Sequence, residues 1–569
     1  METTQATTTE LNPVLVRLFK KRGFSPNEVQ DLLSWNLKDI PELTQMKDLT
    51  KASIRIIEAL EEDQKIGVYG DYDVDGTTSC ALLWHFFKML DIEIEVFQPS
   101  RFIEGYGIHP SSIENALEKN VSVLISVDCG ITNNATADYA REKGIDLIIT
   151  DHHRDAAPEM PKAFAVVNPN RRDEPESPLK ALAGVGVAFA LALQIKKDFL
   201  ERGVEMPSLY PLLQFVAIGT ISDLARMNSL NLKLTRHGLK QIPKTQYPGI
   251  KAFFNPEELN SEMISSERIS FHVGPLINSK GRLDHPDRAL RLLIAQNMNE
   301  AKENYLHLEL ANRDRRLIQQ EVFEEAKKDV IKALNSDELL INILYQPHWH
   351  EGVIGIVASK LVETFQVPAI VFTNAEEEGV IKASARSAGE LNIFELLDQC
   401  KDLFIKFGGH KQAAGLSMKK ENFSLFKERM NSLLKNIPAP LRTKTSSFDV
   451  EVEIEEINAR LLKDLERLEP FGPGHERPIF RMKNALIQSY RIMKDAHVRW
   501  NFGGIKSKTY LQGVSFNYLG KWNESSPEEL FEHQAKAGLT IQFTLGVNRF
   551  NGNETIQLMV DKVIPGTIN

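Results

Sequence analysis

Three short apolar runs in the first half of the chain each lead directly into acidic or histidine residues. Residues 66–69 precede Asp71, Asp73 and Asp75, residues 122–127 precede Asp128, and residues 146–150 precede Asp151, His152 and His153. These runs alternate with helical patterns at 112–119 and 134–143, which indicates β-α units and a parallel sheet. Because ligands of such sheets bind beyond the carboxyl ends of the strands, we expect these side chains to meet in one crevice.

The first acidic cluster predicts a site for a divalent cation. Carboxylates as close as Asp71, Asp73 and Asp75 are costly unless they share a proton or bind a metal, and Mg²⁺ and Mn²⁺ prefer oxygen ligands. The alternative is a solvated acidic turn. A calcium loop of the EF-hand type is excluded, because its twelfth position must be Glu and here it is Leu82.

The two adjacent histidines are expected to have different roles. Consecutive residues just past a strand point in different directions, so one imidazole can bind a metal while the other meets substrate. Asp151 can orient one of these rings as a hydrogen-bond partner. The alternative is a polar loop. Asp223 follows another apolar run, 215–220, which fits either a strand or a helix.

Together these motifs resemble those of a known enzyme superfamily. The segments Asp71-Tyr72-Asp73-Val74-Asp75-Gly76, Asp128-Cys129-Gly130, Asp151-His152-His153 and Asp223 resemble, in order, the motifs of the DHH phosphoesterases. The segments 101–107, 167–169, 182–186, 349–359 and 407–415 resemble the RecJ branch, the single-stranded-DNA-specific exonucleases. The resemblance covers the chain from about residue 50 to its C-terminal region.

The resemblance implies a metal-dependent exonuclease that releases mononucleotides from the 5′ end of single-stranded DNA, in DNA repair and recombination. Two divalent cations, Mn²⁺ or Mg²⁺, are the expected cofactors, and two-metal hydrolysis is the expected mechanism. The implied ligands are Asp73, Asp75, Asp128, His152 and Asp223, with Asp128 bridging the two cations. His153 is expected to contact the scissile phosphate or assist proton transfer. Asp71 and Asp151 are expected to lie around the ligands and orient them without binding the cations themselves.

Further substrate contacts are carried over from the resemblance. They are Asn278, Arg282, Ser384, Arg386, Ser387, Gly408, Gly409 and His410. In the segment 274–282 the arginine usual in the family is replaced by Leu276, and Lys280 can supply the missing charge. Glycines without side chains let a phosphate approach backbone N–H groups, and Arg386 can hold a phosphate with two hydrogen bonds. A tight turn is the alternative explanation for the glycine pair.

A basic segment near the C-terminus predicts a surface that binds single strands. Residues 481–508 contain seven basic residues and one acidic residue, interleaved with aromatic ones. Basic side chains contact phosphates and aromatic rings stack on bases, so we expect Arg491, Arg499 and Trp500 to contribute to such a platform. The alternative is an ordinary exposed sheet face. The net charge of −9 argues against a chain that coats nucleic acid over its whole surface.

Length and composition predict several α/β domains in an ordinary globular protein. The chain has 569 residues, of which 42% are apolar and 25% charged. The expected parts are an N-terminal helical segment (1–50) with a helix start at Ser25, a parallel-sheet DHH catalytic domain (51–295), a connecting helix (296–336), a second α/β domain of the DHHA1 type (337–437) and a C-terminal OB-like β-barrel (444–569). The three cysteines, Cys80, Cys129 and Cys400, are expected to be reduced and structural.

The sequence lacks the pattern of a membrane span or secretory segment, so a cytoplasmic location without membrane contact is expected. Single-stranded DNA is the expected partner, with a single-strand-binding protein or a helicase as a protein partner, and the chain is expected to be a monomer. One alternative is a DHH enzyme that hydrolyses short oligoribonucleotides or cyclic dinucleotides. Another is a metal-free scaffold that only binds DNA or replication partners.

Overall fold

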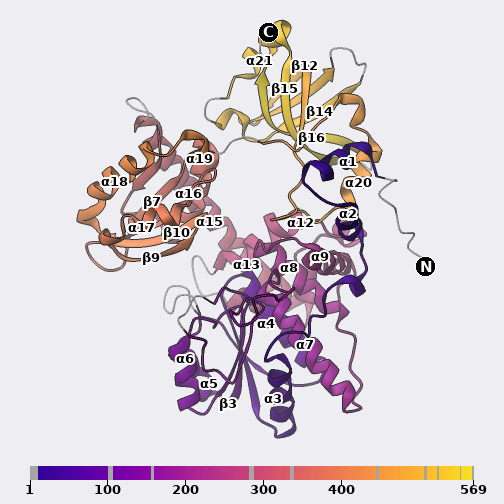
Figure 1. Cartoon of the computed structure of the whole chain (residues 1–569), viewed down its shortest axis with the longest axis vertical. Coiled ribbons are helices and arrows are strands. Elements are labelled where there is room, and N and C mark those ends of the chain that lie inside the picture. The colour runs from indigo at the N-terminus through magenta and orange to yellow at the C-terminus, as the bar shows by residue number, and fades with distance from the viewer. Residues whose placement is uncertain are drawn as a thin grey trace. The chain divides into compact units, whose positions relative to one another are not determined.

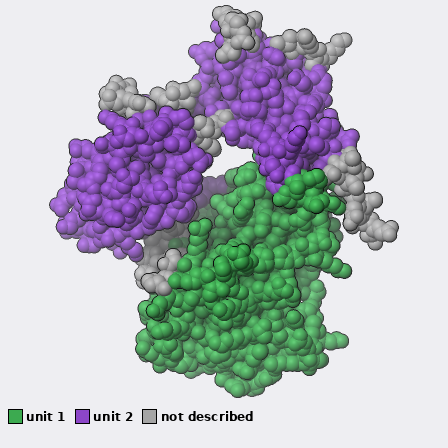
Figure 2. All heavy atoms as spheres, viewed as in Figure 1, with its two compact units in different colours: residues 1–8, 25–313, 466–477 green, residues 9–24, 314–465, 478–569 purple. Residues whose placement is uncertain are grey.

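The computed structural model describes residues 11–99, 107–155, 159–280, 287–333, 339–443, 447–504, 509–521, 524–550 and 553–566. These residues form two compact units, which have different colours in Figure 2. Within the described ranges, unit 1 consists of residues 25–313 and 466–477, and unit 2 of residues 11–24, 314–465 and 478–566. Neither unit is a continuous stretch of the sequence.

Unit 1 is built on a five-stranded sheet. Its strands are β1 (Lys65–Gly70), β2 (Glu95–Phe97), β3 (Val121–Val127), β4 (Asp146–Thr150) and β5 (Ala165–Val167). They lie in the order β2-β1-β3-β4-β5, and each neighbouring pair is parallel. The prediction of a parallel sheet is therefore confirmed.

Helices cover both faces of this sheet (Figure 1). They are α3 (Leu49–Glu61), α4 (Val74–Lys88), α5 (Pro110–Glu118), α6 (Asn134–Glu142) and α7 (Gly184–Glu201). Successive side chains of a strand point to opposite faces. Thus Ile66 and Val68 of β1 pack into the core formed with α3, α4 and α7, whereas Tyr69 packs into the core formed with α5 and α6. The helical patterns at 112–119 and 134–143 correspond to α5 and α6.

A helical layer completes unit 1. Its helices are α2 (Pro26–Leu33), α8 (Leu213–Ser222), α9 (Ser229–Gln241), α10 (Pro248–Lys251), α11 (Pro256–Leu259), α12 (Ser266–Arg268), a π-helix (Ile269–Val273), α13 (Gly274–Lys280) and α14 (Asp287–Leu293). The predicted helix start at Ser25 is confirmed, because Ser25 and Glu28 form a capping box. The ambiguous run 215–220 is helical. Residues 213–221 are all buried, so no polar face marks the helix in the sequence.

The segment 466–477 joins unit 1 through α9. The guanidinium of Arg236, which is fully buried, donates hydrogen bonds to the carbonyls of Glu469 (2.7 Å) and Arg467 (3.0 Å). It also donates to the carbonyls of Leu32 (2.6 Å) and Ser34 (3.2 Å). One side chain therefore ties together three segments that are far apart in the sequence.

A helix of 36 residues, α15 (Met298–Ala333), leads from unit 1 into unit 2 and matches the long helix expected there. The first sheet of unit 2 has the order β6-β7-β8-β10-β9, parallel between β6 and β7 and antiparallel elsewhere. Its strands are β6 (Asn342–Tyr345), β7 (Ala369–Asn374), β8 (Val380–Arg386), β9 (Phe404–His410) and β10 (Ala413–Lys419). Its helices are α16 (Glu351–Phe365), α17 (Ile393–Asp398), α18 (Phe423–Lys435) and α19 (Ala439–Arg442).

A closed β-barrel forms the other part of unit 2. Its elements are β11 (Val450–Glu451), β12 (Phe480–Met493), β13 (His497–Gly504), β14 (Tyr510–Ser515), β15 (Leu539–Phe550), β16 (Asn553–Pro565), α20 (Ala459–Glu466) and α21 (Pro527–Ala537). The strand order β12-β13-β14-β16-β15 closes because β15 also pairs with β12. The predicted barrel is confirmed. The N-terminal helix α1 (Pro13–Lys21) belongs to this unit, and Arg22 after it binds both carboxylate oxygens of Asp449 at 2.9 Å.

Two expectations from composition can be compared with the fold. All three cysteines are buried and none forms a disulfide, as predicted. Among the described residues, no helix combines the length and the apolar character that a membrane span requires.

Candidate functional site

The acidic residues after β1 and β3 meet where the strand order of the first sheet reverses. β1 and β3 are direct neighbours, with β2 beyond β1 and β4 beyond β3. At such a switch point the connections leave in opposite directions and open a crevice at the carboxyl ends of the strands. Asp71, Asp75 and Asp128 are each at most 2% exposed there.

The first turn of α4 carries Asp73 and Asp75. Asp73 caps the helix, because its Oδ1 accepts a hydrogen bond from the Gly76 N–H at 3.0 Å. Asp75 accepts hydrogen bonds from the N–H groups of Gly184 (2.6 Å) and Val185 (2.9 Å). Both donors lie in the first turn of α7, where free N–H groups favour a carboxylate. The Asp75 carboxylate is thereby fixed in direction.

Gly184 allows α7 to approach two carboxylates closely. A Cβ atom at this position would lie 2.7 Å from Asp128 Cβ and 2.9 Å from Asp75 Oδ2. Such distances are too short for real Cβ atoms, so a side chain here would displace the helix or the carboxylates. The family-like segment 182–186 therefore serves to bring a helix N-terminus against the acidic cluster.

Asp128 lies directly after β3 in the left-handed region, with φ of 60°. This conformation costs an L-residue roughly 1–2 kcal/mol, and Asp tolerates it better than most. The Asp128 N–H donates to the Thr150 carbonyl at 3.0 Å, which anchors the turn to the end of β4. Strained backbone of this kind concentrates at functional sites.

His152 lies at the centre of the cluster. Its Nε2 is 3.1 Å from Asp128 Oδ1, 3.6 Å from Asp75 Oδ2 and 3.9 Å from Asp223 Oδ2. Asp223 reaches this position from the C-terminus of α8, so a helix end joins the strand ends at the site.

Asp151 holds the histidine turn together. Its Oδ1 accepts from the N–H groups of His152 (2.7 Å) and His153 (3.0 Å) and lies 2.8 Å from His153 Nδ1, while Oδ2 accepts from the Ile131 N–H at 2.9 Å. Although burial lowers it, the pKa of His153 is raised to about 9 by Asp151. Although burial opposes the change, His153 lowers the pKa of Asp151. His153 is therefore cationic at neutral pH beside an ionised Asp151.

Two asparagines fix the backbone of the same turn. Asn168 donates to the His153 carbonyl at 2.9 Å, and Asn170 donates to the His152 carbonyl at 2.6 Å. Asn168 lies in the family-like segment 167–169, to which the sequence assigned no role, and Asn170 was not predicted as a functional residue. An amide side chain shortly after a strand was the available signal, but it did not reveal which carbonyls it would meet.

The carboxyl groups of the cluster oppose one another's ionisation. Burial raises the pKa of Asp75; His152 counteracts this and Asp73 adds to it. Burial and then the carboxylates of Asp75 and Asp73 raise the pKa of Asp128 well above its ordinary value. Burial, and then Asp75, raise the pKa of Asp223 to about 8. A bound cation would favour the ionised forms of all three.

The donor set fits divalent cations. Three groups have donor atoms within 4.8 Å of one another: Asp75, His152 and Asp223; Asp128, His152 and His153; and Asp71, Asp73 and Asp128. Asp128 Oδ1 and His152 Nε2 are buried and have no hydrogen-bond partner within the described residues. Buried polar atoms are rarely left so, and carboxylate oxygens with imidazole suit Mn²⁺ and Mg²⁺. Asp71, expected outside the ligand set, lies as close to Asp73 and Asp128 as a ligand would.

Of the remaining predicted contacts of unit 1, one lies on α13, which packs beside α8. Asn278 is half-buried on this helix. Arg282 lies outside the described residues.

In unit 2, four predicted substrate contacts share one face of the sheet. Arg386 and His410 both pair with Ala413 of β10, and Ser384 and Gly408 both pair with Gly415. Residues directly opposite each other, and residues two apart along a strand, lie on the same face. The Arg386 guanidinium also donates to Ser384 Oγ at 2.8 Å.

Two further predicted contacts, Ser387 and Gly409, have interactions that serve the local fold. Ser387 is buried, and its hydroxyl donates to the Leu391 carbonyl at 2.6 Å. Gly409 lies on the opposite face from Gly408 and has φ of 152°. A Cβ atom there would lie 2.4 Å from the Ala413 carbonyl oxygen, so the hairpin itself requires this glycine.

The predicted single-strand platform needs a correction. Trp500 is fully buried in the barrel, and its Nε1–H donates to Ser515 Oγ at 2.9 Å, so its ring cannot stack on a base. Strand alternation is the reason: Arg499 points outward and its neighbour must point inward. Arg491 and Arg499 are exposed and face each other across β12 and β13, so only the basic part of the platform remains.

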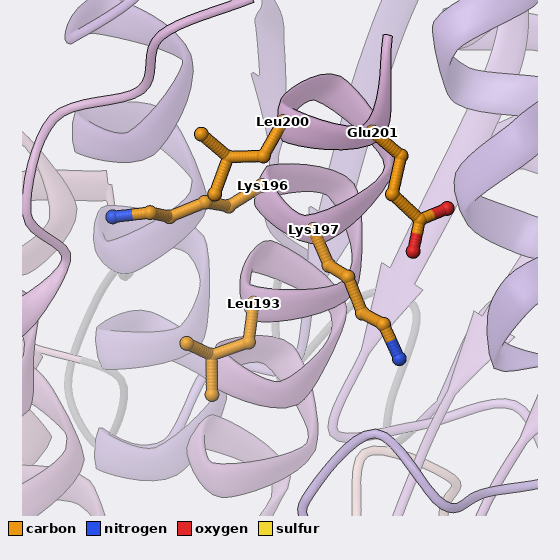
Figure 3. A pocket seen from close by; sticks show the side chains of 5 residues that line it. All are labelled: Leu193, Lys196, Lys197, Leu200 and Glu201. Atoms are coloured by element: carbon orange, nitrogen blue, oxygen red, sulfur yellow. The ribbon is translucent and has the colours of Figure 1, made fainter. Parts of the chain in front are cut away.

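A hollow on α7 lies away from the acidic cluster. Figure 3 shows its lining side chains, Leu193, Lys196, Lys197, Leu200 and Glu201. Leu193 is nine residues beyond Gly184, about 13 Å along the helix. This apolar hollow is therefore separate from the site built around Asp75 and Asp128.

Comparisons with known proteins cover both units. Residues 65–220 match the model of the DHH family, N-terminal domain, residues 337–436 match the DHHA1 domain, and residues 448–562 match the RecJ OB domain.

Individual relatives extend over nearly the whole chain. The single-stranded-DNA-specific exonuclease RecJ of Escherichia coli is 32% identical, covering 98% of this chain and 96% of its own. That of Bacillus subtilis is 32% identical over 97% and 68% of the two chains. The crystal structure of RecJ from Thermus thermophilus in complex with Mn²⁺ matches with a TM-score of 0.77 and 26% identity, covering 97% and 76%. The chain therefore belongs to the RecJ family of DHH proteins.

Proposed function

We propose that this chain is a metal-dependent exonuclease that hydrolyses single-stranded DNA from the 5′ end to mononucleotides. The observation that carries the proposal is the convergence of Asp75, Asp128, His152 and Asp223. Within the described residues, Asp128 Oδ1 and His152 Nε2 are buried and lie 3.1 Å apart, yet neither has a hydrogen-bond partner. The relatives named as single-stranded-DNA-specific exonucleases support the choice of substrate. Repair and recombination are the proposed setting.

The proposed ligands are Asp73, Asp75, Asp128, His152 and Asp223, with Asp128 shared between two cations. Mn²⁺ or Mg²⁺ is proposed because a relative has been crystallised in complex with each. When bound, the cations activate water as the nucleophile and offset charge on the phosphate.

The chain's own residues would orient and protonate the substrate. Asp151 holds Nδ1 of His153, and the other ring nitrogen is proposed to face a phosphate of the substrate. Against the effect of burial, the hydrogen bond with Asp151 raises the pKa of this imidazole, which favours a ring that can donate a charge-assisted hydrogen bond to the phosphate or a proton to the leaving oxygen. Arg386, His410 and the backbone at Gly408, with Asn278 and Arg282, are proposed to hold the strand.

We also propose the finer assignments that the comparisons leave open. The chain acts as a monomer in the cytoplasm, with a single-strand-binding protein or a helicase as a partner. The division at residues 50, 295, 336 and 437–444 is proposed as its functional organisation.

Replacement of Asp128 tests the site. Asp128→Ala should abolish digestion of single-stranded DNA with Mn²⁺ or Mg²⁺, because it removes the carboxylate shared by two of the three donor groups. The measurement is release of mononucleotides from a 5′-labelled strand, with circular dichroism to check the fold. Asp138→Ala, on the surface of α6, is the matched control. Full activity of the Asp128 variant would refute the assignment.

Substrate competition separates the two enzyme classes considered. A labelled DNA strand, an RNA strand and a cyclic dinucleotide are digested side by side by the full chain. We expect the DNA strand to be degraded fastest. Faster hydrolysis of short ribonucleotides would favour the alternative DHH activity.

A further inference from the structure

The sheet of unit 2 has an open face with three rows of residues across β8, β10 and β9. From one end to the other, the rows are Arg386, Ala413 and His410; Ser384, Gly415 and Gly408; and Lys382, Ser417 and Lys406. The intervening residues, such as Ala385, Leu416 and Ala383, are buried in the core on the opposite face. We call these three rows the open face. Its first row contains predicted contacts, and its third row has no assigned role.

Helix α16 lies along one side of the open face. A Cβ atom at Gly355 would lie 3.0 Å from both Arg386 Nη2 and Ser384 Oγ, so the helix touches the first two rows. Glu351, at the start of the same helix, forms an ion pair with Lys382 of the third row. On the other side, Gly408 and Lys406 of β9 are exposed. Helix α16 therefore borders the open face along β8, while Gly415 of β10 and Gly408 and Lys406 of β9 stay exposed beside it.

The third row repeats the chemistry of the first at a fixed distance. Positions four apart along a strand are about 13 Å apart. The first row offers Arg386 and His410, and the third offers Lys382, Lys406 and the Ser417 hydroxyl. Gly415 and Gly408 between them add no side chain. The three rows contain no Phe, Tyr or Trp, which favours contact with a sugar-phosphate backbone over base stacking.

Lys406 is the cation best suited to an outside ligand. Lys382 is already neutralised by Glu351. Lys406 is exposed, and no ion pair or hydrogen bond to its ammonium group occurs among the described residues. Its ammonium group is therefore available as a point charge for a phosphate.

We propose that the third row is a second phosphate-binding subsite, in which Lys406 and Ser417 hold a phosphate of the same strand that Arg386 and His410 hold in the first row. This inference rests on the proposed function, because the ligand is the backbone of single-stranded DNA. This subsite would add a contact to the DNA backbone and so strengthen binding of the strand, independently of the base sequence. Lys406 is a positioning residue and does not take part in the chemistry.

The test compares Lys406→Ala with Lys427→Ala, an exposed lysine on α18, in the full chain. Binding of a labelled 20-nucleotide strand is measured without divalent cation between about 50 and 300 mM salt. Loss of one phosphate contact should weaken binding severalfold and reduce the slope of log K against log[salt] by about 0.7. With Mn²⁺, KM should rise severalfold and kcat stay unchanged. Lys406→Arg should restore the slope, and Lys427→Ala should behave as wild type.

Equal salt slopes for Lys406→Ala and Lys427→Ala would overturn the subsite, as would a fall in kcat with KM unchanged. Failure of the proposed function would look different. In that case the wild-type chain would release no mononucleotides from single-stranded DNA, while the binding slopes would still decide whether Lys406 contacts a phosphate.

Discussion

Asp75 and Asp128 are both buried carboxylates of one cluster, yet their surroundings differ. Asp75 is bound by two backbone N–H groups of α7, whereas Asp128 Oδ1 has no hydrogen-bond partner among the described residues. A carboxylate fixed by backbone donors has one preferred direction. A cation site needs carboxylates that are already oriented and oxygen atoms not taken up by hydrogen bonds; Asp75 supplies the first and Asp128 Oδ1 the second.

The raised pKa of Asp223 predicts how the stability of the metal-free chain depends on pH. The pKa of this carboxyl is about 8 in the fold and near its ordinary value of 3.8 in the unfolded chain. Between these values the folded state binds the extra proton, so the free energy of unfolding should fall as pH rises from about 4 to about 8. Urea unfolding at pH 5 and pH 8 with a chelator measures this change.

Asp223→Asn supplies the control, because an amide cannot titrate. Its free energy of unfolding should fall less between pH 5 and pH 8 than that of the wild type. An equal fall in both chains would show that Asp223 does not contribute.

At the scale of residues, the sequence predicted chemical type better than orientation. The acids and histidines after β1, β3 and β4 do meet, because parallel strands bring their carboxyl ends to one edge. Trp500 was assigned to the surface because composition alone does not reveal which face of a strand is buried. The contacts of Asn170 with the His152 carbonyl could not be predicted, since they depend on the exact path of a loop.

At the scale of elements, the N-terminus of α7 is the part most sensitive to a small change. Gly184→Ala should reduce nuclease activity at least tenfold, because the added methyl group would collide with Asp128 and Asp75 and move the N–H donors away. Steady-state digestion of a labelled strand measures the loss. Gly186→Ala is the control, since its nearest neighbour is the flexible side chain of Leu182. Equal activity of the two variants would contradict this role of Gly184.

Helices whose caps or periodicity are encoded within a few residues could be predicted from the sequence. Features that depend on the pairing between strands could not. The capping box of Ser25 and Glu28 and the periodic pattern of α6 are encoded within a few residues. The apolar run in α8 has no polar face, so strand and helix remained equally compatible. The rows that place Lys406 beside Ser417 depend on the register between β9 and β10, which no local pattern specifies.

At the scale of the whole molecule, Arg236 joins the segments of unit 1 that are far apart in the sequence, so the stability of this unit should depend on it. Arg236→Met should destabilise the chain by roughly 2–4 kcal/mol, because four carbonyls from two other segments lose their donor. The free energy of unfolding in urea is the measurement. Lys244→Met, at an exposed position, is the control and should change it little. A loss below about 0.5 kcal/mol for Arg236→Met would contradict the prediction.

The return of residues 466–477 to unit 1 has a consequence for synthesis on the ribosome. Domains generally fold in order as the chain emerges, the N-terminal ones first. Here the carbonyls that Arg236 binds at Arg467 and Glu469 emerge more than two hundred residues after Arg236 itself. Unit 1 can therefore complete its fold only after the whole five-stranded sheet β6–β10 of unit 2 has been synthesised, so a ribosome stalled before residue 466 holds an incomplete unit 1.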